Sequence, residues 1–257
     1  MTPYTHSTWR IKPLIAAHFL AAFLVCSVFY PPLYNILWKT ADSSCFYKMT
    51  GLIASSTFWQ NFWAIANHRI GDLIEDVFFL VFFLWLIKIT PRGQKLQKSA
   101  EFLFLALLTT AVVLFVNNFL FKQAVHIVRH SPSLTLPDAP KLSHFITWIK
   151  VKSGSKASFP SDHAVTAVMF ICNFLYLSRN TFFSLCVCLY GAFLCCPRMI
   201  AGAHWLTDIL CGSSSVVLIV FSWAFYTPFA SFCMKKIHML FMKIASLFPR
   251  HAYKENI

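Results

Sequence analysis

Long apolar segments alternate with short polar ones along most of the chain. A helix needs about 20 mainly apolar residues to cross the hydrocarbon part of a bilayer. Six segments reach or approach that length: 14–30, 70–89, 102–121, 164–178, 182–196 and 205–226. The pattern therefore predicts an all-α integral membrane protein with six transmembrane helices, forming a single domain over residues 1–257.

The segment after the sixth predicted span has a different periodicity. Ile237, Leu240, Phe241 and Ile244 share one helical face, and the nearby lysines lie off that face. This pattern is typical of a basic amphipathic helix on a membrane surface. It predicts such a helix over about 231–248.

Composition supports a membrane protein, because 58% of the residues are hydrophobic and 28 are phenylalanine. The formal charge of +13 first suggests nucleic acid as a partner. However, the basic residues flank the apolar segments and do not form a stripe. We therefore expect membrane lipids as partners and no nucleic acid.

The loop 88–98 contains Lys88, Arg92, Lys95 and Lys98 and no acidic residue. By the positive-inside rule this loop is cytoplasmic. Counting six spans from it places both termini on the cytoplasmic side. The long polar loop 122–162 then lies on the opposite side.

Residues suited to metals or disulfides do not form a recognisable pattern. The nine cysteines include no CxxC pair and no zinc-type spacing, and most lie in apolar segments. Asp72, Glu75 and Asp76 cluster at the start of the second span, where acids facing water are more common than a metal site. We therefore predict no metal and no cofactor.

The segment 197–208 contains three residues that suit phosphate chemistry. Arg198 carries a planar fork of donors that matches phosphate oxygens. His204 and Asp208 are four residues apart, a spacing that on a helix places the carboxylate beside the imidazole. A carboxylate in that position can orient a catalytic histidine. Alone, such a pair is more often an ordinary hydrogen bond.

Two further clusters precede this one and give the pattern its specificity. Lys122 and Arg129 lie seven residues apart, and Pro160-Ser161-Asp162-His163 begins the fourth apolar segment. With the third cluster they resemble the signature of the type 2 phosphatidic acid phosphatase superfamily: Lys-x6-Arg-Pro, Pro-Ser-Gly-His and Ser-Arg-x5-His-x3-Asp. The resemblance covers roughly 60–230.

The chain departs from that signature at three points. The proline of the first motif arrives only at Pro132, Asp162 replaces the glycine of the second motif, and Pro197 replaces the serine of the third. The position of Asp162 beside a phosphate site has no physical explanation at this stage.

The resemblance implies a haloperoxidase-like helical core and a metal-independent reaction at histidine. His204 would be the nucleophile, Asp208 would orient it, and His163 would be the acid and then the base. The residues implied to bind phosphate are Lys122, Arg129, Ser161, Asp162 and Arg198. Because both histidines must reach one phosphorus, an even number of spans lies between them, which favours two helices over 164–196.

The strings 128–136, 158–163 and 197–208 are similar to one branch of the superfamily. Its members transfer a phosphate from undecaprenyl diphosphate to the 1-phosphate of lipid A at the periplasmic face of the bacterial inner membrane. The resemblance implies the same transfer here. Hydrolysis of undecaprenyl diphosphate or of another lipid phosphate by the same residues stays open. A transporter or scaffold is the non-enzymatic alternative.

Overall fold

The computed structural model describes residues 8–54, 56–115, 127–136, 138 and 140–247. The regular secondary structure of these residues is helical, apart from one isolated bridge between Arg129 and Ala157, and loops join the helices. The predicted all-α class is therefore confirmed for the described part of the chain.

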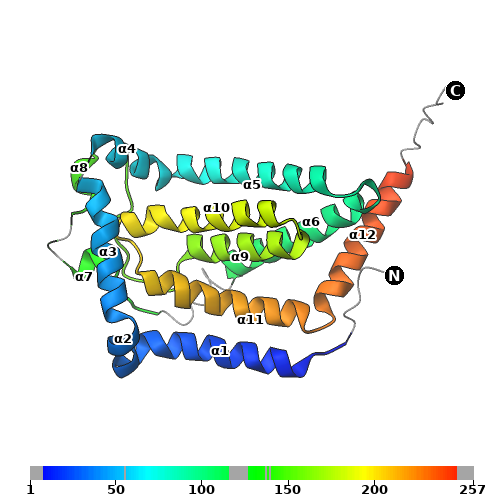
Figure 1. Cartoon of the computed structure of the whole chain (residues 1–257), viewed down its shortest axis with the longest axis horizontal. Helices are drawn as coiled ribbons and strands as arrows, with labels where there is room; N and C mark the ends of the chain where they lie inside the picture. The colour runs from blue at the N-terminus through cyan, green and yellow to red at the C-terminus, as the bar shows by residue number, and fades with distance from the viewer. Residues whose placement is uncertain (1–7, 55, 116–126, 137, 139, 248–257) are drawn as a thin grey trace.

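Six helices form the body of the molecule, and they lie roughly side by side (Figure 1). They are α1 (Ile11–Phe29), α5 (Arg69–Ile89), α6 (Lys95–Ala111), α9 (Asp162–Leu177), α10 (Thr181–Ile200) and α11 (Ser214–Phe225). Each except α6 contains most of one predicted apolar segment. The segment 102–121 is only partly covered, because residues 116–126 lie outside the described residues.

By length and composition, four stretches of helix can cross a membrane. They are Ile11–Phe29, Arg92–Phe115, Thr181–Ile200 and Asp208–Phe225. Helix α9 is apolar but has only 16 residues, and α5 has 21 residues but carries charged residues at both ends. Four of the six predicted spans thus meet the criterion.

A capped break separates α9 from α10, as the sequence predicts. The Ser178 hydroxyl accepts a hydrogen bond from the Asn180 amide at 3.2 Å, and the Asn180 side chain accepts one from the Phe183 amide at 2.8 Å. Asparagine is a favoured residue at this position because its side chain satisfies an amide that has no partner within the helix. The two helices therefore run antiparallel, and the end of α10 lies near the start of α9.

An aromatic core holds α5, α9 and α10 together. Phe82, Phe170, Phe174 and Phe183 are all buried and touch one another, with the Phe82 and Phe170 ring centroids 5.2 Å apart. Edge-to-face contacts of this kind stabilise packing beyond the area they bury. This core packs the second halves of α5 and α9 against the first turn of α10 and so holds the three helices side by side.

Short helices cover the end of the bundle at which α9 and α11 begin and α10 ends (Figure 1). Helix α3 (Lys39–Ala54) lies across this end, between α2 (Pro31–Leu37) and α4 (Thr57–Ala66). Two one-turn helices, α7 (Pro132–Thr135) and α8 (Leu142–Phe145), lie beside it.

Helix α12 (Phe229–Leu247) crosses the opposite end and packs on α6 through Ala230 and Met234, which are both buried. It occupies the place of the predicted amphipathic helix. Leu240 and Ile244 remain exposed on its surface. The loop between α5 and α6 lies at this same end (Figure 1), so the basic loop and the predicted site are at opposite ends of the bundle.

Candidate active site

His163 belongs to a polar cluster formed by three helices. It is the second residue of α9, and its Nε2 atom lies 2.6 Å from Nη2 of Arg198 in the last turn of α10. The same Nε2 atom lies 3.3 Å from Oδ1 of Asp72 in the first turn of α5. The structure thus brings His163 and Arg198 together, as the motifs predict, and adds a carboxylate to them.

Arg198 is held in a fixed orientation from its other side. Its Nη1 donates to the backbone oxygen of Asn67 at 2.9 Å and to the Asn67 side-chain oxygen at 2.7 Å. The Asn67 amide in turn donates to the Pro197 carbonyl at 3.0 Å. Arg198 is only 8% exposed, and the Nη2 edge of its guanidinium faces His163. That edge has the donor geometry that phosphate oxygens favour.

His204 lies in a turn between α10 and the π-helix η3 (Asp208–Ser213), and not on a helix as its spacing from Asp208 had suggested. Its Nδ1 atom lies 2.7 Å from the Ser158 carbonyl oxygen. Because a carbonyl can only accept, Nδ1 carries the proton and Nε2 of the neutral ring is unprotonated. The neutral ring therefore presents an unprotonated nitrogen on its other side.

Asp208 is close to His204, but the ring is not its main partner. The distance from Asp208 Oδ2 to His204 Nδ1 is 3.6 Å, whereas Oδ2 accepts from the Trp205 amide at 2.8 Å. Oδ1 of Asp208 forms an ion pair with Nη1 of Arg129. The predicted proximity is confirmed. The direct orienting contact to His204 comes from the Ser158 carbonyl, which the sequence does not reveal.

Arg129 joins two fully buried carboxylates. Besides Asp208, it donates through Nη2 to Asp42 Oδ2 at 3.1 Å and to the Thr207 hydroxyl at 2.8 Å. Asp42 also accepts from the Thr207 amide at 2.9 Å and from the Thr207 hydroxyl at 2.7 Å. The charge of Arg129 is therefore balanced by protein carboxylates. Arg198 has a longer ion pair through the same edge that meets His163, with its Nη2 3.6 Å from Oδ1 of the half-exposed Asp72.

Tyr34 completes this buried network from the adjoining helix α2. Its hydroxyl donates to Asp42 Oδ2 at 3.1 Å. Burial, assisted by the negative charge of Asp42, raises the pKa of Tyr34 to about 12. The phenol thus stays protonated and keeps donating throughout the physiological pH range.

The segment 157–163 links the two histidine clusters. The Ser158 amide donates to the Arg129 carbonyl at 2.9 Å, while the Ser158 carbonyl binds His204. Five residues later the chain reaches His163. Each histidine has its own partners, and this short segment sets the position of both.

Three other predicted residues have different outcomes. Ser161 is 1% exposed and caps α9, because its hydroxyl accepts from the Ala164 amide at 3.4 Å. Asp162 is the first residue of α9, where a carboxylate interacts favourably with the helix dipole. This gives a local reason for an acid at a position where the superfamily signature has glycine. Lys122 lies outside the described residues.

Sequence reasoning missed Asp42, Asn67, Asp72 and Ser158 as members of the site. Asp72 had been interpreted as a water-facing acid at a helix end, and its side chain is indeed 44% exposed, yet it faces His163. The only sign in the sequence that these residues belong to the site is that they are polar residues near apolar segments. That sign does not indicate a contact with a residue far away in the sequence.

Within the described ranges, no group of three or more histidine, cysteine or acidic residues could hold a metal ion. We expect the phosphate charge to be balanced by cationic side chains, with Arg198 nearest to His163. Activity should therefore persist in excess chelator. Complete loss of activity on chelation, restored by a divalent ion, would contradict this expectation.

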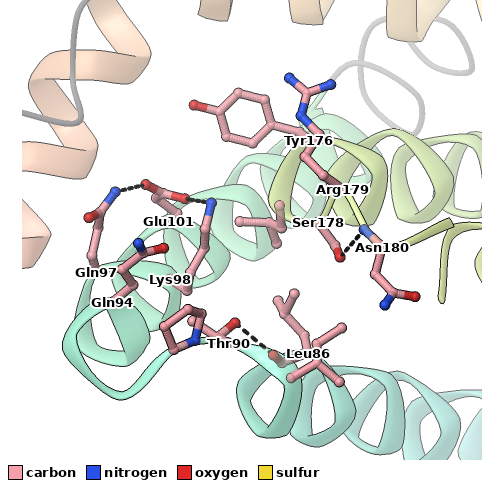
Figure 2. A pocket seen from close by; sticks show the side chains of 13 residues that line it. Leu86, Thr90, Gln94, Gln97, Lys98, Glu101, Tyr176, Ser178, Arg179 and Asn180 are labelled. Atoms are coloured by element: carbon pink, nitrogen blue, oxygen red, sulfur yellow. Dashed lines mark hydrogen bonds and ion pairs between the residues drawn. The ribbon is translucent and has the colours of Figure 1, made fainter.

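A polar pocket at the opposite end of the bundle is a poor candidate for the same chemistry. It has a volume of about 520 Å³ and lies between the α5–α6 and α9–α10 connections (Figure 2). Lys98 and Gln97 both point to the buried Glu101 and donate to it at 2.8 and 2.6 Å. The described lining includes no histidine, and the one lysine among these residues is paired.

Comparison with known proteins agrees with this placement of the site. The pattern that defines the PAP2 superfamily matches residues 102–232, which contain both histidines, Arg129, Arg198 and Asp208. The chain is 29% identical over 211 residues to the lipid A 1-diphosphate synthase of Escherichia coli (strain K12), covering 81% of this chain and 84% of that protein.

No solved structure matches the chain. The match to the family and the similarity to the synthase, together with the apolar helices, indicate a multi-pass membrane enzyme that acts on lipid phosphates. The match to the family extends over half of the sequence. The chain is a member of the PAP2 superfamily.

Proposed function

We propose that the protein transfers the terminal phosphate of undecaprenyl diphosphate to the 1-phosphate of lipid A. The products are lipid A 1-diphosphate and undecaprenyl phosphate. The observation that carries the proposal is the fixed ring of His204, whose Nδ1 is held by the Ser158 carbonyl so that Nε2 is the attacking atom. The similarity to lipid A 1-diphosphate synthase supports the choice of substrates.

In the first half of the reaction, Nε2 of His204 attacks the terminal phosphorus. A P–N bond forms as the bond to the bridging oxygen breaks, and undecaprenyl phosphate leaves. His163 donates a proton to the leaving oxygen, which is general acid catalysis. Asp72, 3.3 Å from Nε2 of His163, stabilises the protonated ring before transfer.

Arg198 has two successive roles in this scheme. Without substrate its Nη2 donates to His163, which keeps that ring neutral. When phosphate enters, its oxygens accept from the guanidinium, and His163 can then take a proton beside Asp72. Positive charge placed where negative charge develops is a major source of catalysis in phosphoryl transfer. Lys122 would assist Arg198 in binding the phosphate oxygens.

In the second half, an oxygen of the lipid A 1-phosphate attacks the phosphohistidine. The P–N bond breaks and the new P–O–P linkage forms, while His163 accepts any proton that the acceptor oxygen carries. Asp208 and Arg129 act through the protein, because their buried ion pair fixes the turn on which His204 lies.

Hydrolysis is the alternative reaction of the same intermediate, with water replacing the lipid acceptor. One experiment separates the two. Purified protein is given undecaprenyl diphosphate labelled in its terminal phosphate, with and without lipid A, and the products are separated. Transfer predicts label in lipid A 1-diphosphate when lipid A is present. Release of free phosphate at the same rate in both reactions would favour hydrolysis.

We further propose that α5 and α9 complete a set of six membrane spans, with the site facing the periplasm of a bacterial inner membrane. Both helices lie alongside the four that meet the length criterion (Figure 1). The basic α5–α6 loop then lies in the cytoplasm.

This topology predicts the behaviour of reporter fusions. Ser143 in α8 and Gln94 near the start of α6 lie at opposite ends of the bundle. A reporter active only outside the cytoplasm should therefore work when fused near Ser143 and fail near Gln94. The reverse pattern would contradict the proposed orientation.

A further inference from the structure

A groove lies between α1, α9 and α11 and has a volume of about 480 Å³. This volume falls in the range of about 300–1,000 Å³ that is usual for ligand pockets. Its lining includes two arginines, Arg10 immediately before α1 and Arg179 two residues after the end of α9. Helix α1 begins and α9 ends on the side of the molecule opposite the candidate active site (Figure 1). The groove, which we call the α1/α9/α11 groove, therefore has a cationic mouth on that side.

The groove extends from this mouth along all three helices. Ala17 lies seven residues after Arg10 on α1, and Cys172 lies seven residues before Arg179 on α9. On α11 the lining reaches Leu218, two turns before the end of that helix. At a rise of 1.5 Å per residue, these intervals correspond to about 10 Å of helix. The groove thus runs along the helix axes, in the direction that a lipid chain takes in a bilayer.

The walls beyond the mouth are mostly apolar. The Tyr176 and Phe225 ring centroids are 4.7 Å apart, and those of Phe221 and Phe225 are 5.2 Å apart. Ser222 also lines the groove, but its hydroxyl donates to the Ile219 carbonyl at 2.8 Å. This part of the groove therefore suits a hydrocarbon chain and not a polar ligand.

The two arginines at the mouth have no acidic partner. Within the described residues neither Arg10 nor Arg179 forms an ion pair, and the described lining contains no acid. Arg10 is held beside the groove, with its guanidinium 5.5 Å from the ring centroid of Tyr226 and its amide donating to the Tyr226 carbonyl at 2.8 Å. Figure 2 shows that the Arg179 guanidinium does not point toward Glu101, the acid of the adjoining polar pocket. The mouth is thus complementary to an anion.

Two tryptophans indicate the depth of this mouth in a membrane. Trp9 directly precedes Arg10, and Trp223 lies in the last turn of α11. Both are exposed, and their ring centroids are 6.2 Å apart. Tryptophan is enriched where a membrane protein meets the lipid head groups. The mouth therefore lies at head-group depth, with the apolar walls in the hydrocarbon region.

We propose that the α1/α9/α11 groove binds one phospholipid with an anionic head group. The two guanidinium groups bind the phosphate oxygens, and one acyl chain occupies the apolar part. Basic pockets between membrane helices bind anionic head groups in this way. A zwitterionic head group carries its own cation, which the two arginines repel. This lipid is not a substrate in the proposed transfer, because its phosphate lies on the side of the molecule opposite His163 and His204.

Native mass spectrometry of the purified protein in detergent tests the head-group assignment. The full chain is titrated with phosphatidylglycerol, or with phosphatidylcholine of the same acyl chains, and without either proposed substrate. The wild type should bind the first phosphatidylglycerol about tenfold more tightly, the effect of one charge-assisted contact. Arg10→Gln and Arg179→Gln should each remove most of this preference. Arg92→Gln, at an exposed position outside the groove, should keep it.

A second pair of variants tests the site of the acyl chain. Ala17→Trp fills the apolar part of the groove and should weaken binding of phosphatidylglycerol about tenfold. Ala16→Trp, at the exposed neighbouring position outside the groove, should not. Thermal unfolding gives an independent measurement, because a ligand of the folded state raises the unfolding midpoint. Phosphatidylglycerol should raise the midpoint of the wild type more than that of Arg179→Gln.

Three outcomes would overturn the proposal. The first is equal binding of the two lipids by the wild type, and the second is an equal loss of preference in Arg92→Gln and Arg179→Gln. The third concerns glycerol phosphate, a soluble competitor that should leave the bound lipid in place. If it displaces the lipid and Ala17→Trp has no effect, the arginines bind a soluble anion. If Ala17→Trp does not fold, the exposed arginine variants still decide the result, and no outcome depends on the proposed transfer.

Discussion

His204→Ala is expected to abolish both turnover and phosphate capture on the protein. In the proposed scheme this histidine forms the covalent bond to phosphorus, so no other group replaces it. His163→Ala is expected to slow the reaction about 10²–10⁴-fold, the usual contribution of a general acid or base. Labelled phosphate bound to the protein should therefore be absent in the first variant and form slowly in the second.

A series of donors with different leaving groups distinguishes the two roles. A better leaving group needs less protonation as its bond to phosphorus breaks. Activated donors should therefore partly rescue His163→Ala and leave His204→Ala inactive. Equal rescue of both variants would mean that nucleophile and acid are assigned wrongly, or that water attacks the donor directly.

Asp42→Ala is expected to destabilise the protein strongly, although Asp42 does not touch the phosphate in our scheme. The change removes the acceptor for Arg129, Tyr34 and Thr207 in a fully buried position. Breaking a buried ion pair by removing one partner typically costs about 3–5 kcal/mol. Thermal unfolding in detergent should show a large decrease in midpoint, and activity should fall with it.

Asp42→Asn is the matched control for this prediction. It keeps one acceptor oxygen and the size of the side chain but removes the charge. Arg129 retains Asp208 as its charged partner, so the loss of stability should be clearly smaller than for Asp42→Ala. Equal stability of the wild type and Asp42→Ala would show that the buried network does not support the turn that carries His204.

The sequence predicts features that depend on nearby residues. The break between α9 and α10 was predicted because both histidines must reach one phosphorus, and the structure shows local caps at Ser178 and Asn180 that stabilise it. The long helices were predicted from the apolar segments. The motif residues His163 and Arg198 also meet as predicted, because their superfamily signature already records a long-range arrangement.

Features that depend on distant contacts could not be predicted in this way. Asp42 accepts a hydrogen bond from Thr207, 165 positions away, and Asn67 holds Arg198 from 131 positions away. The residues that surround Asp42 or Asn67 in the sequence do not indicate which distant residue each side chain contacts. The turn at His204 was missed for a related reason, since its spacing from Asp208 also fits a helix.

A chase of phosphorylated protein tests the central claim most directly. The protein is loaded with phosphate from labelled undecaprenyl diphosphate, freed of donor, and mixed with lipid A. The account predicts acid-labile label on His204 that passes to lipid A 1-diphosphate on addition of the acceptor. Label that never appears on the protein during active transfer, or that leaves only as free phosphate with lipid A present, would contradict it.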